Sequence, residues 1–252
     1  MKVIDISRYN GAITWSKAAK QIDGVIIRAG YRGYGSGKLV IDSSFKKNIA
    51  GASAAGLPIG VYFVTQAVTT EEAKAEARYT MELVKGYKLS LPIFIDSEDG
   101  NKGAGRADRG KLSKFNRTAI LKSFCEEIQK GGYTAGIYAS NSWFKDYLDI
   151  TMLKSFFLWV ARYSTNKPTI PYNAWQYTDA GVIDGIKGYV DISNFLTDTN
   201  TQPKQKSNEE IADEVLAGKW GNGEARKKAL TAASYNYRAV QDIVNRKIKE
   251  RG

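Results

Sequence analysis

The sequence predicts an α/β protein, an irregular, TIM-like (β/α) barrel followed by a small three-helix bundle. Short apolar runs alternate with helix-like segments, which is the pattern of parallel strands joined by helical crossovers. Eight such runs fall within about 200 residues, near the lower size limit of an eight-stranded barrel. The first and last runs are near copies, Val-Ile-Asp-Ile-Ser at 3–7 and Tyr-Val-Asp-Ile-Ser at 189–193, and barrel closure would make them neighbours.

Each predicted strand is a short run rich in β-branched or aromatic residues. In chain order these strands are Val3–Ile6, Gly24–Ala29, Pro58–Val64, Pro92–Asp96, Thr134–Tyr138, Phe157–Ala161, Ala174–Tyr177 and Gly188–Ile192. A doubly wound open sheet is the alternative, but no Gly-x-Gly-x-x-Gly follows the first strand. The glycine-rich segment 30–37 lacks the Lys-Ser/Thr of a phosphate loop, so we interpret it as a mobile loop.

The predicted helices lie between these strands, and fewer than eight are expected because the later connections are short. The segment that begins Glu71-Glu72 is amphipathic, with Thr70 as its N-cap. In chain order the predicted helices are Thr14–Gln21, Ser44–Ala55, Glu71–Gly86, Lys111–Lys130 and Asn141–Leu148.

The absence of histidine excludes several kinds of active site. Ser-His-Asp triads, Cys-His pairs and histidine-bound zinc all need an imidazole, and the chain has none. The single cysteine, Cys125, excludes internal disulfides and cysteine-rich metal sites. We therefore expect no metal and no cofactor, and acid–base chemistry carried by Asp, Glu, Tyr, Lys or Arg.

The net charge of +11 favours an anionic partner. The basic residues are spread along the chain without a dense basic arm, which disfavours nucleic acid as the partner. A bacterial wall that carries anionic polymers would attract a protein of this charge just as well. No apolar stretch reaches the roughly 20 residues of a membrane span. Met1-Lys2 leads directly into a predicted strand, so we expect no signal peptide and synthesis in the cytoplasm.

Two carboxylates at the end of the fourth predicted strand are the main candidates for catalysis. Asp96 and Glu98 are two residues apart, so in an extended chain they point to the same side. Each would raise the pKa of the other, and glycoside hydrolysis uses one protonated and one ionised carboxyl group. Asp5 and Asp191 would reach the same rim of a closed barrel. Because four acids there repel one another, a functional role is favoured over ordinary turn residues.

Aromatic side chains gather near the same rim, where sugar rings could stack on them. Aromatic residues are core residues first, so only those at or just past strand ends are candidates to face a cleft: Tyr62, Tyr138 and Tyr163.

Five motifs resemble, in order, the signatures of glycoside hydrolase family 25. They are Asp-Ile-Ser-Arg-Tyr-Asn-Gly at 5–11, Gly-Val-Tyr-Phe at 60–63, Phe-Ile-Asp-Ser-Glu at 94–98, Trp-Gln-Tyr at 175–177 and Val-Asp-Ile-Ser-Asn-Phe at 190–195. The resemblance covers residues 1–197 and implies a flattened, irregular β/α barrel. It also implies a lysozyme that hydrolyses the β-1,4 bond between N-acetylmuramic acid and N-acetylglucosamine in peptidoglycan.

Matched to these motifs, Glu98 is implied to be the proton donor and Asp96 its electrostatic partner, with Asp5 and Asp191 completing the cluster. The nucleophile stays open, because the N-acetyl group of muramic acid could itself attack. The family often has Tyr-His-Phe where this chain has Tyr-Phe-Val at 62–64, so any role of that histidine is absent. We expect five residues to bind substrate, namely Tyr62, Tyr138, Tyr163, Trp175 and Gln176.

The chain changes character after residue 197. Residues 198–207 are polar and predict a linker. Residues 208–252 predict three short helices, from a capping box at 207–210, a C-cap at Gly218 and N-caps at Asn222 and Asn236.

Two stretches of this tail, 211–226 and 235–241, resemble the CW_7 cell-wall-binding repeat of phage lysins. The resemblance implies binding of peptidoglycan muropeptides through Trp220, Gly221, Asn222, Gly223, Arg226 and Tyr237. A single repeat binds weakly, so a homo-oligomer formed through this module could supply avidity.

The leading hypothesis is thus a phage-type endolysin that stays in the host cytoplasm until lysis and then acts on the cell wall. A chitinase-like glycosidase is one alternative, because barrel chitinases also end a strand in Asp-x-Glu. Their two upstream aspartates are replaced here by Leu91 and Phe94. A non-catalytic peptidoglycan-binding protein is the other alternative, and retention of all four acids disfavours it.

Overall fold

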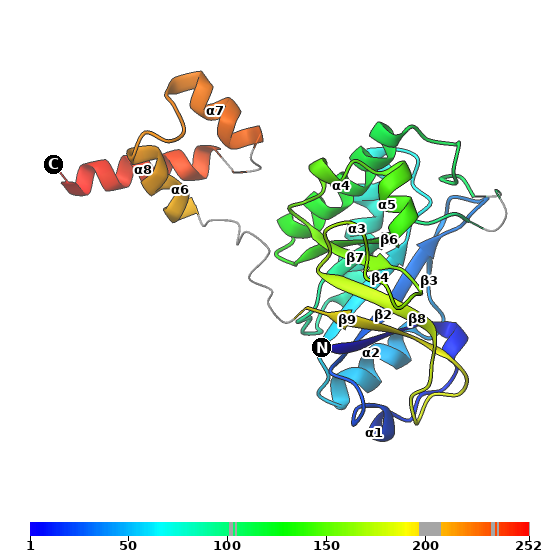
Figure 1. Ribbon diagram of the computed structural model, residues 1–252. Helices are drawn as coiled ribbons and strands as arrows, with labels where there is room; N and C mark the ends of the chain where they lie inside the picture. The colour runs from blue at the N-terminus through cyan, green and yellow to red at the C-terminus, as the bar shows by residue number, and fades with distance from the viewer. Residues whose placement is uncertain (101–102, 104, 197–207, 233–234, 236, 252) are drawn as a thin grey trace. The chain divides into compact units, whose positions relative to one another are not determined.

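The computed structural model describes residues 1–252 except 101–102, 104, 197–207, 233–234, 236 and 252. The chain divides into two compact units, residues 1–199 and 200–252. The first is a closed barrel with outer helices, and the second consists of helices (Figure 1). The predicted linker and the predicted capping residues at positions 207 and 236 lie outside the described residues.

Eight strands close the barrel, and each matches a strand that the sequence predicts. Their order around the barrel is β1–β2–β4–β5–β6–β7–β8–β9, and β9 pairs again with β1. The predicted closure between the first and last strands is therefore confirmed. The strands are β1 (Lys2–Ile6), β2 (Gly24–Arg32), β4 (Ile59–Val64), β5 (Ile93–Asp96), β6 (Ala135–Ser140), β7 (Phe157–Ala161), β8 (Ala174–Gly181) and β9 (Val190–Phe195).

Strand β9 runs antiparallel to both of its neighbours, so the prediction of parallel strands is wrong at this position. Only residues 182–189 connect β8 to β9, and a parallel return needs a crossover of about a dozen residues or more. The antiparallel register places Asp191 directly opposite Asp5. Asp191 therefore reaches the rim from the start of its strand, whereas Asp5 reaches it near the end of its own.

The segment predicted to be a mobile loop, residues 30–37, is in part a hairpin. Residues 30–32 continue β2 and pair antiparallel with β3 (Leu39–Ile41), a strand absent from the prediction. The register of β2 shifts between Arg28 and Gly30, and a Cβ at Gly30 would lie 2.4 Å from the carbonyl oxygen of Val40. Glycine is required there because the two backbones approach so closely.

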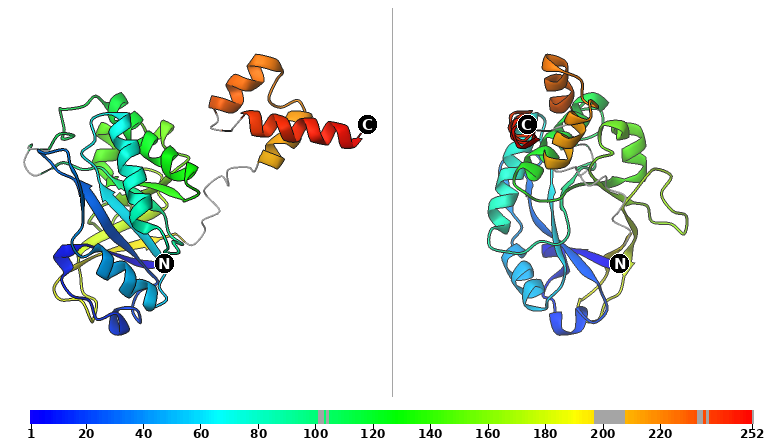
Figure 2. Two further views of the ribbon diagram at one scale, coloured as in Figure 1. Left: turned by 180° about the vertical axis from the view of Figure 1, so that it is seen from behind. Right: turned by 90° about the vertical axis from the view of Figure 1, so that its left-hand side faces the viewer.

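Helices cover part of the barrel wall. Helices α2 (Phe45–Ala54) and α3 (Thr70–Val84) pack against β2, while α4 (Lys114–Lys130) and α5 (Asn141–Tyr147) pack against β6. Helix α1 (Trp15–Ala18) is a single turn, shorter than predicted, and the described residues of the unit also include the 3-10 turns η1 (Arg8–Asn10) and η3 (Ile150–Met152). Figures 1 and 2 show no helix of this unit over the outer face of β8 and β9.

Hydroxyl caps set the starts of two helices, and both starts differ from the prediction. The side chain of Thr69, not Thr70, accepts a hydrogen bond from the backbone N–H of Glu72 at 3.2 Å and begins α3. Ser113 accepts from the backbone N–H of Asn116 at 3.2 Å, so α4 begins after Ser113 and not at residue 111. In each case the side-chain oxygen satisfies an N–H that the first turn leaves unpaired.

Alternation along the strands gives the barrel an apolar inner floor below its rim. The ring of Trp159 lies at the centre of this floor, with centroid distances of 5.0 Å to Phe94 and 4.5 Å to Tyr138. Alternate residues on the same strands face outward and form the core beneath the helices. The buried residues of the floor are Val3, Ile26, Phe94, Phe157, Trp159, Ala174 and Phe195.

The second unit contains α6 (Asn208–Leu216), α7 (Gly223–Ala232) and α8 (Tyr237–Arg251). Gly218 has a φ of +78°, the left-handed conformation expected of the predicted helix end. The apolar core of the second unit is formed by Ile211, Ala212, Val215, Leu230, Val240 and Val244. In the part of the chain that the structure describes, no helix has the length and apolarity to cross a membrane.

Candidate active site

A pocket at the rim of the barrel brings the four predicted acids together. Asp5 comes from β1, Asp191 from the start of β9 and Asp96 from the end of β5, and Glu98 lies two residues beyond β5. We call this cavity, with a volume of about 180 Å³, the acid pocket. Its lining consists of Asp5, Tyr62, Asp96, Glu98, Tyr138, Trp159, Tyr163, Gln176 and Asp191.

Asp5 and Asp96 are buried, with exposed fractions of 7% and 4%. Burial above the aromatic floor disfavours their ionised forms and raises the pKa of both carboxyl groups well above the ordinary value. The negative charges of Asp191 and Glu98 raise the pKa of Asp5 further. Those of Glu98 and Asp5 raise the pKa of Asp96 further, and the positive charge of Arg28 lowers it in part. Oδ1 of Asp96 has no hydrogen-bond partner among the described residues. This buried oxygen is available to a bound molecule.

Glu98 is the one acid of the pocket with an exposed side chain. The protein around its carboxyl group still removes part of its hydration, and this desolvation, followed by the charge of Asp191, raises its pKa. The pKa of Asp191 is raised as well, by desolvation first and then by the charge of Asp179. An accessible carboxyl group with a raised pKa can carry a proton and give it to a bound molecule.

Gln176 connects Asp5 to two tyrosines at the centre of the pocket. Its Nε2 donates to Oδ2 of Asp5 at 2.8 Å, and its Oε1 accepts from the hydroxyls of Tyr138 at 2.7 Å and Tyr163 at 2.9 Å. The two phenol donors require the amide oxygen to face them, and this directs the amide N–H toward Asp5. The bond from Gln176 favours the ionised form of Asp5, so it lowers the pKa of that carboxyl group and offsets part of the effect of burial.

The backbone between Asp96 and Glu98 is held by Trp143 of α5. Ser97 is buried, its N–H donates to the carbonyl oxygen of Tyr138 at 3.0 Å, and its hydroxyl accepts from Nε1 of Trp143 at 3.1 Å. A fixed Ser97 fixes the directions of the acids on either side of it. The sequence motifs single out neither Ser97 in its own right nor Trp143, because these residues act on the pocket through their neighbours.

The chain after Glu98 is anchored by Asp108, another residue that the sequence analysis missed. Asp108 is fully buried and accepts hydrogen bonds from the backbone N–H groups of Gly100 at 2.6 Å and Gly105 at 2.8 Å. Arg117 of α4, also buried, donates to the carbonyl oxygen of Asp108 at 3.0 Å. These bonds tie the segment next to Glu98 to the helix layer.

Trp175 was expected to bind substrate together with Gln176, but the alternation of side chains along β8 separates Trp175 from the acid pocket. Gln176 faces the barrel interior, so Trp175 and Tyr177 on either side of it face outward and line a different cavity. Trp159 lines the acid pocket instead, at an inward position of β7. The two-residue period of the strands is the signal that separates these two tryptophans.

The arrangement suits proton transfer and the stabilisation of positive charge. An accessible protonated carboxyl group beside buried, ionisable ones is what the cleavage of a glycosidic bond through an oxocarbenium-like state requires. Within the described ranges, no group of three or more His, Cys, Asp or Glu side chains is placed to hold a metal ion.

The sequence profile named Glycosyl hydrolases family 25 matches residues 4–186, a range that contains Asp5, Asp96 and Glu98. The chain belongs to glycosyl hydrolase family 25. The lysozyme of Streptococcus phage Cp-7 is 32% identical over 202 residues, which are 75% of this chain and 55% of that protein. The autolytic lysozyme of Clostridium acetobutylicum is 28% identical over 198 residues, 77% of this chain and 56% of that protein. This family-25 chain thus spans about half the length of the curated relatives it matches.

Solved structures show the same barrel. The modular autolysin LytC of Streptococcus pneumoniae matches with a TM-score of 0.67 and 31% identity, over 76% of this chain and 46% of that chain. The CTP1L endolysin matches with a TM-score of 0.64 over 97% of this chain and 99% of that chain. Its identity is 20%, so this second likeness concerns the fold alone.

A second profile, the CW_7 repeat, matches residues 209–248 of the helical unit. Arg226 donates to the carbonyl oxygen of Gly221 at 3.0 Å and to Oδ1 of Asn222 at 2.9 Å, so it holds the connection between α6 and α7 in shape. Tyr237, at the start of α8, packs against the apolar core. The other predicted wall-binding residues lie at or beside the same connection, namely Trp220, Gly221, Asn222 and Gly223.

Proposed function

We propose that this chain is a peptidoglycan hydrolase, a lysozyme that cleaves the β-1,4 bond between N-acetylmuramic acid and N-acetylglucosamine. Family membership and the lysozymes among its relatives support a glycoside hydrolase. The observation that carries the proposal is the contrast between two neighbouring acids. Glu98 is exposed with a raised pKa, whereas Asp96 is buried and has an oxygen without a partner in the described structure.

In this proposal Glu98 is the general acid. It gives its proton to the glycosidic oxygen as the bond to the anomeric carbon breaks, and it is the acid best placed to do so because it faces the solvent side of the pocket. The free oxygen of Asp96 is suited to accept the N–H of the 2-acetamido group of muramic acid. Asp5 and Asp191 supply negative charge beside the sugar as positive charge develops on it.

The C-terminal module supports action at the cell wall. A CW_7 repeat covers nearly all of it, and we propose that it binds peptidoglycan muropeptides through the connection between α6 and α7. Homo-oligomers formed through this module would raise the avidity of a single repeat. The likeness to a phage lysozyme supports a phage-type endolysin, held in the host cytoplasm until lysis and then active on the wall.

The test is the release of reducing sugar from purified peptidoglycan, with mass spectrometry of the fragments, for the wild type, Glu98→Gln and Glu82→Gln. Glu82 is 74% exposed on α3, so its variant controls for the loss of one glutamate charge. We expect fragments that end in reducing muramic acid from the wild type and Glu82→Gln, and a rate at least about 100-fold lower for Glu98→Gln.

Other outcomes would contradict the proposal in different ways. Fragments that end in reducing glucosamine would show that the enzyme cleaves the other bond of the glycan strand. Cleavage of chitin and not of peptidoglycan would favour the chitinase-like alternative. Wall binding without any release of sugar would show a non-catalytic binding protein.

A further inference from the structure

A second and larger cavity lies on the outer face of the barrel wall. Its volume is about 670 Å³, within the range of roughly 300–1,000 Å³ that is usual for ligand sites. It lies over β8, β9 and β1, where Figure 1 shows no helix of the barrel unit outside the strands. We call it the outer cavity. The family-25 activity proposed above does not use it, since none of the four acids of the acid pocket lines this cavity, and Asp5 of β1 lies on the inner side of the barrel wall.

Two aromatic rings form one wall of the outer cavity. The rings of Trp175 and Tyr177 have centroids 5.8 Å apart and an interplanar angle of 64°. Nε1 of Trp175 donates to the carbonyl oxygen of Arg162 at 2.8 Å, so the indole N–H is already satisfied within the protein. The half-buried rings therefore offer apolar surface to the cavity. Flat apolar surface of this kind suits the C–H face of a pyranose ring.

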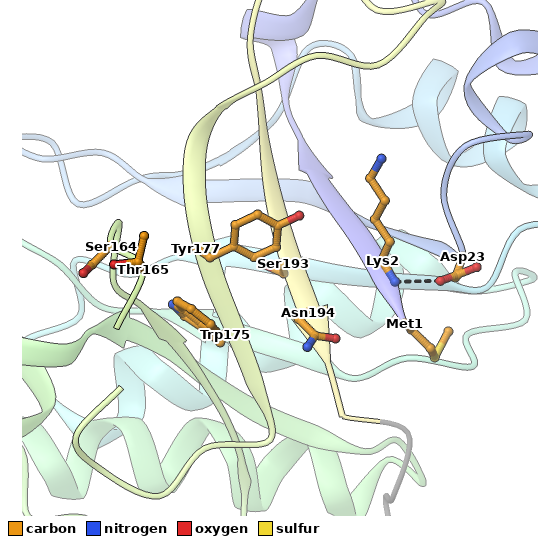
Figure 3. Close-up of a pocket in the computed structure, with 9 residues that line it drawn as sticks. All are labelled: Met1, Lys2, Asp23, Ser164, Thr165, Trp175, Tyr177, Ser193 and Asn194. Carbon is orange, nitrogen blue, oxygen red and sulfur yellow. Dashed lines mark hydrogen bonds between the residues drawn. The ribbon is translucent and has the colours of Figure 1, made fainter. Parts of the chain in front are cut away.

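Polar groups surround this aromatic pair. The ammonium of Lys2, the amide of Asn194 and the hydroxyl of Tyr177 have no hydrogen-bond partner among the residues that the structure describes. Oδ2 of Asp23 accepts from the backbone N–H of Lys2 at 2.6 Å, which leaves its other carboxylate oxygen unpaired. Figure 3 shows Trp175 and Tyr177 on β8, with Asn194 on β9 and Lys2 on β1 beside them. A sugar presents an apolar C–H face and polar hydroxyl groups, and apolar rings bordered by hydrogen-bond donors and acceptors match both.

We propose that the outer cavity is a second saccharide site, which binds a peptide-bearing glycan strand of peptidoglycan outside the acid pocket. The identity of the polymer rests on the proposed function. The Lys2 ammonium is complementary to the carboxylates of the peptide stems, and the Asp23 carboxylate can accept sugar hydroxyls. Because β8 presents Gln176 to one side and Trp175 and Tyr177 to the other, one strand serves both sites. A long polymer that occupies both is held by avidity, whereas a short substrate gains nothing.

The binding test follows two tryptophan indole signals in one NMR titration. Trp159 lines the acid pocket and Trp175 the outer cavity, so each reports on its own site. The full-length Glu98→Gln variant, which is not expected to cleave the probe, is titrated with soluble peptidoglycan glycan strands that keep their peptides. We expect both indole signals to shift. With the same strands freed of peptide, the Trp175 shift should need about three- to tenfold more probe, because Lys2 loses its contact with the carboxylates of the peptide stems.

The kinetic test compares sacculi with a short soluble muropeptide substrate. Tyr177→Ala should raise the sacculi concentration at half-maximal rate by about three- to tenfold, as expected for the loss of one stacking contact, with an unchanged maximal rate and unchanged turnover of the short substrate. Lys2→Gln should act in the same direction without disturbing the fold, because its side chain is exposed. Phe115→Ala is the matched control, since Phe115 is an aromatic residue that is 67% exposed on α4.

The outcomes separate this proposal from the function on which it rests. A shift of Trp159 without a shift of Trp175 would overturn the second site and leave the lysozyme proposal intact. The same conclusion would follow if Tyr177→Ala and Lys2→Gln degraded sacculi like the Phe115→Ala control. If neither indole shifted and the wild type released no sugar, the choice of peptidoglycan as substrate would be wrong.

Discussion

Gln176 is the residue whose replacement tests the internal organisation of the acid pocket. It is 2% exposed and makes three side-chain hydrogen bonds, to Asp5, Tyr138 and Tyr163. We consider Gln176→Met, which keeps the length of the side chain and removes all three bonds. Asp5 then loses a donor to a buried carboxyl group, whereas the two phenols line the cavity and can turn to water.

The expected cost follows from the kind of bond that is lost. A hydrogen bond to a charged group contributes about 1.5–3 kcal/mol, and a neutral bond that water can replace contributes much less. We therefore expect Gln176→Met to lower the free energy of unfolding by about 2–3 kcal/mol. In a chain of this size that is a fall in Tm of roughly 5–10 °C.

The chain offers a matched control in Gln21. Its side chain also makes three hydrogen bonds, with the carbonyl oxygens of Lys17 and Asp184 and the backbone N–H of Asp184, but Gln21 is exposed. Gln21→Met should cost less than about 0.5 kcal/mol. Equal losses of stability in the two variants would refute the idea that Gln176 organises the pocket.

The pH dependence gives a second readout of the same perturbation. The bond from Gln176 lowers the pKa of Asp5, so its loss moves that already raised pKa further up. At low pH Asp5 is protonated in both proteins, whereas at higher pH the variant must ionise a buried carboxyl group without its donor. The loss of stability should therefore be larger at pH 8 than at about pH 4, as chemical denaturation at both values would show. A difference that does not change with pH would place the effect of Gln176 elsewhere than on Asp5.

Two further variants probe the acids and the segment beside them. For Asp96→Asn we expect loss of activity together with a gain in Tm over the wild type that grows from about pH 4 to pH 8. A carboxyl group with a raised pKa stabilises the folded state at a pH below its ordinary pKa, and this contribution is lost as the pH rises through the raised value. A gain in Tm that shrinks with pH would contradict the raised pKa of Asp96. For Asp108→Asn we expect a loss of about 1–3 kcal/mol in unfolding free energy and slower hydrolysis. Gly100 and Gly105 donate to different oxygens of Asp108, and the amide nitrogen that replaces one of these oxygens cannot accept a hydrogen bond. Asp146→Asn, at an exposed position, should match the wild type in both assays.

The acids of the pocket could be found from the sequence because local rules place them. Asp96 ends an apolar run, Glu98 follows at the strand period, and Asp5 and Asp191 lie in near-identical strands. Each of these signals is contained in a few neighbouring residues. The eight strands of the barrel are predictable for the same reason.

The direction of β9 and the outward position of Trp175 were available from the sequence but needed one more step. The connection of residues 182–189 is too short for a crossover, and this fixes β9 as antiparallel. Gln176 and Trp175 are adjacent in a strand, so they cannot both face the same pocket. The two-residue period that identified Asp96 and Glu98 thus also divides the Trp-Gln-Tyr motif between two cavities.

The supports of the pocket are different, because no local pattern contains them. Trp143 reaches Ser97 across 46 residues, and Gln176 reaches Asp5 across 171. Such contacts depend on how the closed barrel and its helices pack, and a single sequence shows neither partner as special.

The aromatic floor and the acid rim are linked by the geometry of the strands. The residues two positions before Asp5 and Asp96 on their own strands are Val3 and Phe94, and both belong to the apolar floor. The regular alternation along the strands thus places each of these carboxyl groups next to a buried apolar side chain on the inner face of the barrel. Desolvation is the largest cause of the raised pKa values of both acids, so the floor is part of the chemistry as well as of the fold. Glu98 lies beyond the end of β5, past this alternation, and for that reason it combines a raised pKa with access to a substrate.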